Sequence, residues 1–132
     1  MKLTPYLMFN GDCEEALNFY SRTIGGEIKH LSRFEGSPAE SMSADKQKVM
    51  HATFEGNGIT LMASDGSQPV SNSANIHLCM DFKDTAAMDN VFNLLAEGGN
   101  ITMPLQDTFW GARFGMLTDR FGINWMFNSE MK

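Results

Sequence analysis

Apolar and polar residues alternate with two different periods along the chain, and these periods predict where strands and helices lie. Runs with the two-residue alternation of a strand are followed by stretches in which apolar residues recur every three or four positions. One predicted helix begins at Cys13, and Asp84 or Thr85 can cap the start of the other. Each helix ends at a glycine pair. The predicted strands cover residues 4–9, 27–34, 49–55, 59–64, 75–82, 101–105, 113–118 and 123–128.

Turn residues separate these runs. Gly56-Asn57-Gly58 is typical of a hairpin turn, and Asp119 followed by Gly122 predicts a second tight turn. Asp12, with Glu15 three positions later, has the form of a capping box at the start of the first helix. Residues 35–48 show no periodicity and predict a connecting loop.

The same order of elements occurs twice. One strand, one helix and three strands precede a polar, turn-rich segment, and the order then repeats, with a glycine pair ending the helix each time. A repeated unit too small to bury its own apolar face predicts that the two copies pack together. We therefore expect an α+β fold in which one domain, residues 1–132, contains two βαβββ modules with mixed sheets. The modules span about 1–66 and 74–132, with a linker at 67–73.

Strand alternation also predicts a binding surface. Each run has one apolar face for helix packing and one semipolar face, and a concave semipolar face can hold and orient a small ligand. Trp110 and Arg113 lie beside the last hairpin, where they could cover a flat group and bind an anionic one. The candidate pocket residues are His51, Thr53, Thr60, Met62, Asn75, His77, Trp110, Arg113, Asn124 and Met126.

Other roles are open for some of these residues. His51 and His77 are equally consistent with hydrogen-bonded structural histidines. Cys79 fits a small packing residue better than a nucleophile, because no cationic neighbour is evident from the sequence. For Trp110, packing in the core or at a dimer interface and a place in the pocket wall are both open.

Composition limits the partners. A formal net charge of −6 argues against nucleic acid and anionic membranes, both of which attract basic patches. The two cysteines have no C-x-x-C spacing, and the first residues lack the apolar core of a signal peptide, so we expect a reduced, cytoplasmic setting. No apolar run approaches the roughly 20 residues that cross a bilayer, so no membrane segment is expected.

Three groups of residues carry a resemblance to a known family. They are Pro5-Tyr6-Leu7-Met8-Phe9-Asn10-Gly11-Asp12, His51-Ala52 with Leu61-Met62-Ala63-Ser64-Asp65, and Thr108-Phe109-Trp110 with Thr118-Asp119-Arg120-Phe121-Gly122. This pattern resembles the PhnB-like branch of the vicinal oxygen chelate superfamily, which also includes glyoxalase I, bleomycin-resistance proteins, fosfomycin-resistance enzymes and extradiol dioxygenases. The resemblance implies paired βαβββ modules, each curved into a cup, in a homodimer.

The resemblance also implies a divalent metal held by one residue from each of four strands. The corresponding positions lie near Pro5, Thr60, Asn75 and Met126, none of which is a good ligand for a hard or borderline divalent ion. No cofactor is therefore predicted. A displaced divalent metal site at His51, Glu55 and His77 is the weaker alternative.

These observations predict a small-molecule-binding protein of the glyoxalase/bleomycin-resistance fold that lacks the usual metal ligands. The expected partners are a small organic ligand and a second copy of the chain. The alternative is a metal-dependent lyase or transferase using the displaced His/Glu site. A dimeric scaffold without a ligand is a third reading, and whether the protein is an enzyme is left open.

Overall fold

The computed structural model describes residues 1–43, 45–66, 70–71 and 74–130. The chain divides into two compact units, Met1–Ser71 (unit 1) and Asn72–Lys132 (unit 2). Most of the predicted linker, at 67–69 and 72–73, lies outside the described residues.

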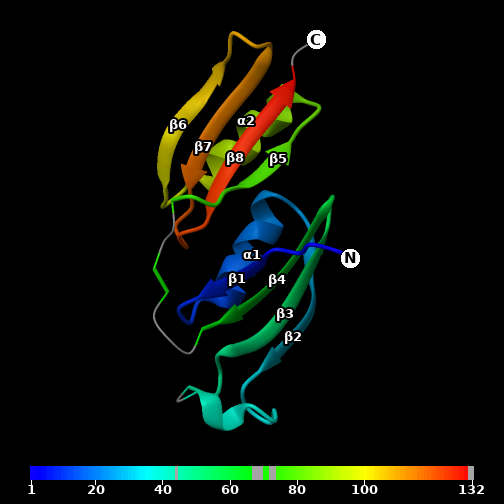
Figure 1. Ribbon diagram of the computed structural model, residues 1–132, viewed down its shortest axis with the longest axis vertical. Coiled ribbons are helices and arrows are strands. Elements are labelled where there is room, and N and C mark those ends of the chain that lie inside the picture. The colour runs from blue at the N-terminus through cyan, green and yellow to red at the C-terminus, as the bar shows by residue number, and fades with distance from the viewer. Residues whose placement is uncertain (44, 67–69, 72–73, 131–132) are drawn as a thin grey trace. The chain divides into compact units, whose positions relative to one another are not determined.

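Unit 1 contains a four-stranded mixed sheet with one helix against it (Figure 1). The strand order is β1-β4-β3-β2, with β1 parallel to β4 and the other neighbours antiparallel. Its elements are β1 (Tyr6–Phe9), α1 (Cys13–Thr23), β2 (Glu27–Arg33), the short 3-10 helix η1 (Glu40–Met42), β3 (Val49–Gly56) and β4 (Ile59–Asp65). The segment 35–48, predicted as a loop, therefore carries one short helical turn.

Unit 2 repeats this topology. The strand order is β5-β8-β7-β6, and β5 is parallel to β8. Its elements are β5 (Leu78–Asp81), α2 (Thr85–Leu95), β6 (Asn100–Asp107), β7 (Ala112–Thr118) and β8 (Asn124–Glu130). The predicted α+β fold of two βαβββ modules is confirmed.

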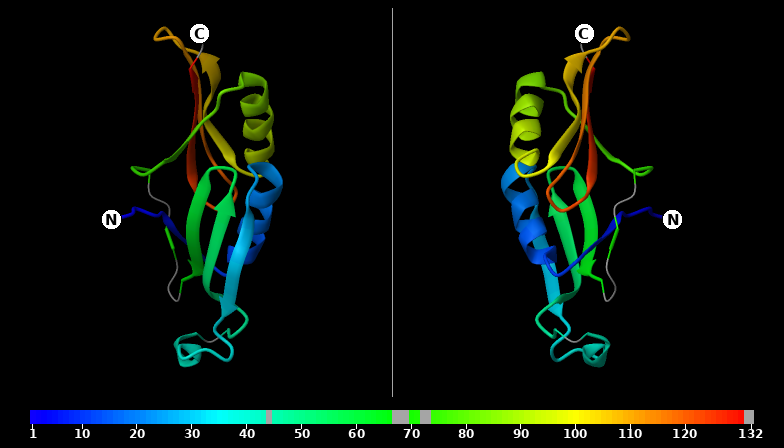
Figure 2. Two further views of the ribbon diagram at one scale, coloured as in Figure 1. Left: turned by 90° about the vertical axis from the view of Figure 1, so that its right-hand side faces the viewer. Right: turned by 90° about the vertical axis from the view of Figure 1, so that its left-hand side faces the viewer.

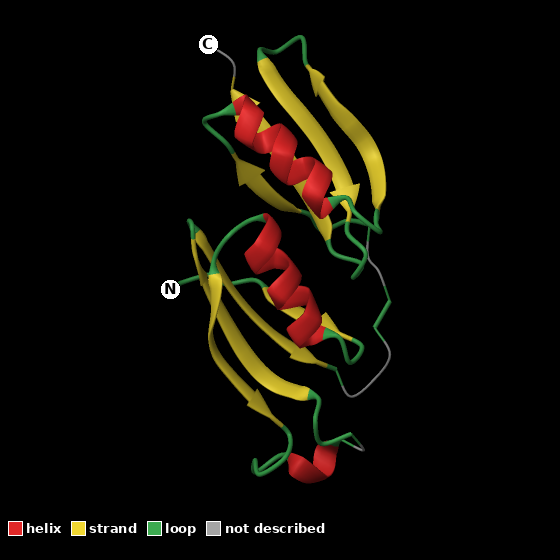
Figure 3. Ribbon diagram, turned by 180° about the vertical axis from the view of Figure 1, so that it is seen from behind, coloured by secondary structure: helices red, strands yellow, loops and turns green. Residues whose placement is uncertain are grey.

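In each unit the helix covers one face of the sheet, as Figures 2 and 3 show for the two units separately. Apolar side chains on that face form the core, because alternate residues of a strand point to the same side. In unit 1 the fully buried side chains include Leu17 and Tyr20 of α1 and Phe54 of β3. In unit 2, Phe127 of β8 packs edge-on against Phe92 of α2, with ring centroids 5.0 Å apart.

The two helices start in different ways. The predicted capping box at Asp12 is wrong, because the Asp12 side chain makes no cap hydrogen bond. Instead, the carboxylate of Asp65, at the end of β4, accepts from the backbone N–H of Cys13 at 3.0 Å. In unit 2 the predicted cap at Asp84 is confirmed, because its side chain accepts from the N–H of Ala86.

One strand starts later than predicted. The run 75–82 was expected to be extended throughout, but β5 covers only Leu78–Asp81. Its partner β8 begins at Asn124, and Leu78 already pairs with Trp125, so few β8 residues are left to pair with earlier positions. Neither described helix is long and apolar enough to cross a membrane.

Candidate functional site

The face of the unit 1 sheet turned away from α1 carries four of the predicted pocket residues. Thr53 of β3 pairs with Met62 of β4, and Thr60 pairs with Glu55, so their side chains share a face. His51 has the same strand parity as Thr53. All four predicted residues are partly exposed, whereas Ala52 and Leu61, on the other face, are buried. We call this surface the open face of unit 1; it contains His51, Thr53, Thr60 and Met62, together with Tyr6 and Met8 of β1.

Tyr6 is a member of this face that the sequence analysis missed. Its strand partner is Met62, and its hydroxyl lies 3.2 Å from Nδ1 of His51. The two rings are tilted by 31°, with centroids 5.8 Å apart. Strand parity was the available sequence signal, because it places Tyr6 and Met8 on the side opposite Leu7 and Phe9. In the structure Leu7 and Phe9 are buried, and Tyr6 and Met8 are exposed.

Unit 2 has an equivalent face, on which Met126 of β8 pairs with Cys79 on one side and Met116 on the other. Asn124 lies on the same face, but its amide is already engaged. Its nitrogen donates to the carbonyl of Ile76 at 3.0 Å, and its oxygen accepts from the Thr118 hydroxyl at 2.8 Å. Asn124 therefore ties the segment just before β5 to the hairpin of β7 and β8.

The structure places Asn75 and His77 ahead of β5 rather than within it. Asn75 lies in an exposed turn, and His77 is partly exposed. Both belong to unit 2, whereas His51, Thr53, Thr60 and Met62 belong to unit 1. Of the ten predicted residues, four lie in unit 1 and six in unit 2.

Arg113 differs from its prediction. In β7 it pairs with the buried Ser129, which places it on the side of the sheet that faces α2. Its Nε donates to Asp89 of α2 at 2.9 Å, and its Nη1 donates to Asp107 at 3.1 Å. Hydrogen bonds to Asp89, and then to Asp107, raise the pKa of Arg113. The guanidinium therefore ties helix to sheet and does not lie on the open face.

Trp110 lies in the turn between β6 and β7 and is 60% exposed. It packs edge-on against Phe109, with ring centroids 5.0 Å apart, and its ring lies 6.4 Å from that of Phe114. Phe114 pairs with Asn128, which has the strand parity of Met126. Trp110 therefore stands at the hairpin end of the unit 2 sheet.

The two cysteines have different surroundings. Cys13 in α1 is fully buried, and burial raises the pKa of its thiol to about 12, with further contributions from Asp65, Asp12 and Glu14. Cys79 is exposed, so it is not the packing residue that the sequence suggested. Partial burial, and then Asp81, raise the pKa of the Cys79 thiol. Neither thiol is activated as a nucleophile, because activation requires a lowered pKa.

The residues at the superfamily's metal positions do not fit a divalent ion. Pro5 has no side-chain donor atom, and Met126 offers only a thioether. In the displaced alternative, His51 and Glu55 are four residues apart on β3, about 13 Å along a strand, which is too far to share one ion. Within the described ranges, no group of three or more His, Cys, Asp or Glu side chains is placed to hold a metal.

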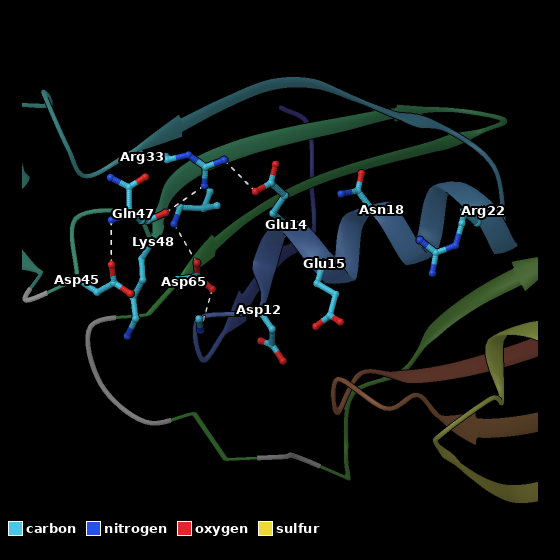
Figure 4. Close-up of a pocket in the computed structure, with 12 residues that line it drawn as sticks. Asp12, Glu14, Glu15, Asn18, Arg22, Arg33, Asp45, Gln47, Lys48 and Asp65 are labelled. Carbon is cyan, nitrogen blue, oxygen red and sulfur yellow. Dashed lines mark hydrogen bonds and ion pairs between the residues drawn. The ribbon is translucent and has the colours of Figure 1, made fainter.

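Unit 1 also has a cleft of about 550 Å³ between α1 and the loop before β3 (Figure 4). Arg33 donates to Glu14 of α1 across this cleft at 2.8 Å. Asp65 forms part of its wall, but its two oxygens already accept from the N–H groups of Gly11, Cys13 and Val49. The remaining lining residues are Asp12, Glu15, Asn18, Arg22, Asp45, Gln47 and Lys48. A second cleft lies at the start of α2 in unit 2, lined by Asp81, Phe82, Lys83, Asp84, Thr85, Asn128 and Glu130.

Comparison with known proteins identifies relatives over the whole chain. Protein YjdN of Escherichia coli (strain K12) is 34% identical over 139 residues, covering 97% of this chain and 95% of the relative. The crystal structure of protein PA1353 from Pseudomonas aeruginosa has 41% identity and a TM-score of 0.88, covering 100% of this chain and 99% of that one. A PhnB protein from Bacillus cereus has 32% identity and a TM-score of 0.85, covering 98% and 99%.

More distant structures share the fold alone. A glyoxylase/bleomycin resistance protein/dioxygenase domain from Frankia sp. EAN1pec has a TM-score of 0.68 at 13% identity, covering 100% of this chain and 93% of that one.

The family model described as 3-demethylubiquinone-9 3-methyltransferase matches residues 1–127. The chain therefore belongs to this PhnB-like family, and it shares the fold of the glyoxylase/bleomycin resistance protein/dioxygenase domain.

Proposed function

We propose that this protein binds a small organic molecule on the open faces of its sheets, without a metal at the superfamily's usual ligand positions. The observation that carries the proposal is the open face of unit 1, where Tyr6, His51, Thr53 and Met62 combine polar and apolar groups. Binding sites for small molecules have this composition, because apolar surface supplies affinity and a few polar groups supply orientation.

The absence of suitable ligands does not weaken a binding role. Walls that exclude water and orient a molecule need no ion, whereas a lyase or transferase of the metal-dependent kind needs a Lewis acid. Pro5 and Met126 cannot supply that ion's ligands. The proposal is therefore for a binding protein. We also propose that it forms a homodimer and acts in the cytoplasm.

The description of the family names a methyl transfer, but no feature of the sequence supports that activity here. A nucleotide-type cofactor is commonly held by a glycine-rich turn between a strand and a helix. The glycine pairs of this chain, Gly25-Gly26 and Gly98-Gly99, follow helices instead.

A thermal-shift screen of small organic compounds, in buffer containing a chelator, tests the proposal. We expect stabilising compounds whose effect disappears in Met62→Trp, which fills the open face of unit 1. The matched control is Asn18→Trp, which instead narrows the cleft beside α1. Compounds that no longer stabilise Asn18→Trp but still stabilise Met62→Trp would place the site in that cleft and contradict the proposal.

A further inference from the structure

The hydrogen bond between Tyr6 and His51 joins strands that are not neighbours in the sheet. Tyr6 is on β1 and His51 on β3, with β4 between them, and the hydroxyl reaches Nδ1 at 3.2 Å. A neutral imidazole has one nitrogen that donates and one that accepts, and the partner of one nitrogen decides the role of the other. The bond to Tyr6 therefore couples the hydroxyl to the choice of which His51 nitrogen carries the proton.

We propose that Tyr6 holds His51 with its proton on Nε2, so that the open face of unit 1 selects a flat, uncharged molecule with an acceptor oxygen. This inference rests on the proposed function and names the ligand class for the same face. A phenol hydroxyl donates readily, and an unprotonated imidazole nitrogen accepts through its lone pair. With Nδ1 accepting from Tyr6, Nε2–H is the donor, and a carbonyl, amide or ether oxygen is its complement.

The charges on this face argue against an anionic ligand, and a cation is disfavoured by the Nε2–H donor of His51. Glu55 has the strand parity of Thr53 and pairs with Glu27 of β2, so two carboxylates stand at one end of the face. Lys29 forms an ion pair with Glu27 and offsets one of these charges. The net charge of the three side chains remains negative, which repels an anionic ligand.

The apolar groups on this face argue for a flat ligand. Tyr6 and Met8 are 43% and 49% exposed, and they lie on the same side of β1. An aromatic ring favours stacking with a flat group, and a flexible thioether adapts to its outline. Tyr6 thus has two roles, as part of the apolar surface and as the partner of His51.

Side-chain nitrogen NMR tests the protonation of His51 without any ligand. At about pH 8.5, where free imidazole is neutral, we expect an unprotonated Nδ1 and a protonated Nε2. Tyr6→Phe should change the Nδ1 signal of His51 but not the signals of His30 and His77, the other two histidines. His51→Gln identifies the resonances. A protonated Nδ1 in the unmodified protein, or no change in Tyr6→Phe, would overturn the proposal.

A set of three matched probes tests the ligand class. Benzamide is flat and uncharged and has an acceptor oxygen, benzoate is anionic, and benzylamine is cationic and has no acceptor. We expect benzamide to bind at least about fivefold more tightly than benzoate or benzylamine. In His51→Phe its affinity should fall about fivefold, the typical value of one hydrogen bond. Equal or stronger binding of either charged probe would overturn the assigned class.

Two results separate this inference from the proposed function. If none of the probes binds but other compounds bind at Met62, the assigned class is wrong and the binding role stands. If neither the probes nor the library compounds bind, the proposed function fails together with the inference.

Discussion

The two units share a topology but fix the start of the helix differently. In unit 1 the buried carboxylate of Asp65, only 3% exposed, accepts from Gly11, Cys13 and Val49. One side chain therefore ties β4 to the turn before α1 and to the start of β3. In unit 2 the helix is capped locally by Asp84, whose carboxylate accepts a hydrogen bond from the N–H of Ala86, two residues later.

The corresponding end of β8 shows the contrast most clearly. Ser129 is buried on the face toward α2, as Asp65 is in unit 1, but its hydroxyl has no hydrogen-bond partner among the described residues. The repeat is thus kept by apolar alternation and glycine breaks, while the polar groups at equivalent places have diverged. Unit 1 should depend on one distant contact, and unit 2 on local ones.

Asp65→Ala should have the largest effect. Removing the carboxylate leaves buried N–H groups without an acceptor, which we expect to lower the free energy of unfolding by about 4 kcal/mol. Denaturant unfolding measures this loss, and labelling of the buried Cys13 reports opening of unit 1. Asp45→Ala, at an exposed aspartate beside the same cleft, is the control and should change stability by less than about 0.5 kcal/mol. Equal effects of the two variants would refute the role of Asp65.

Gly26→Ala tests the close approach of helix end and sheet in unit 1. Gly26 has φ +88°, and an added Cβ would lie 2.7 Å from the Phe54 ring. Left-handed strain and overpacking together should cost about 3 kcal/mol. Gly36→Ala is matched in backbone strain, with φ +76° and open space around it, and should cost about 1 kcal/mol. A difference near zero in the measured unfolding free energies would show that the Phe54 contact is unimportant.

Asp84→Ala should have a smaller effect, because it removes a single local cap. We expect a loss of about 1 kcal/mol. Both tryptophans lie in unit 2, so fluorescence-detected unfolding follows the affected unit. Asp12→Ala, at the same position before α1, should change stability by less than about 0.5 kcal/mol, because Asp65 makes the bond in its place. A larger loss of stability in Asp12→Ala than in Asp84→Ala would contradict the contrast between the units.

Ser129→Ala should have the smallest effect. Replacing a buried hydroxyl that has no partner removes a desolvation cost, so stability should stay within about 0.5 kcal/mol or rise slightly. Thr118→Val removes a hydroxyl that donates to Asn124 and should cost about 1 kcal/mol. A larger loss in Ser129→Ala than in Thr118→Val would indicate that Ser129 has a partner after all.

The features that the sequence predicts well are local. The hairpin turn at Asp119 follows from residues that bond within four positions, since its carboxylate accepts from Phe121 and Ile123. Strand alternation likewise places Thr53 and Met62 on one face, because parity is a property of each strand alone.

The features that the sequence misses depend on distant partners. Asp65 accepts a hydrogen bond from the N–H of Cys13, which lies 52 residues away in the sequence. The nearby Asp12 therefore gave a misleading capping pattern. The start of β5 depends on where β8 begins. Arg113 was assigned to the pocket by its position beside the hairpin, whereas its parity within β7 directs it toward Asp89.

The central claim is metal-independent binding of a small molecule on the open face of unit 1. Backbone amide NMR during titration of a compound from the screen, in chelator, tests it most directly. We predict the largest shift changes at Thr53, Thr60 and Met62. Changes confined to α1 and residues 45–48, or changes that appear only after a divalent metal is added, would contradict the claim.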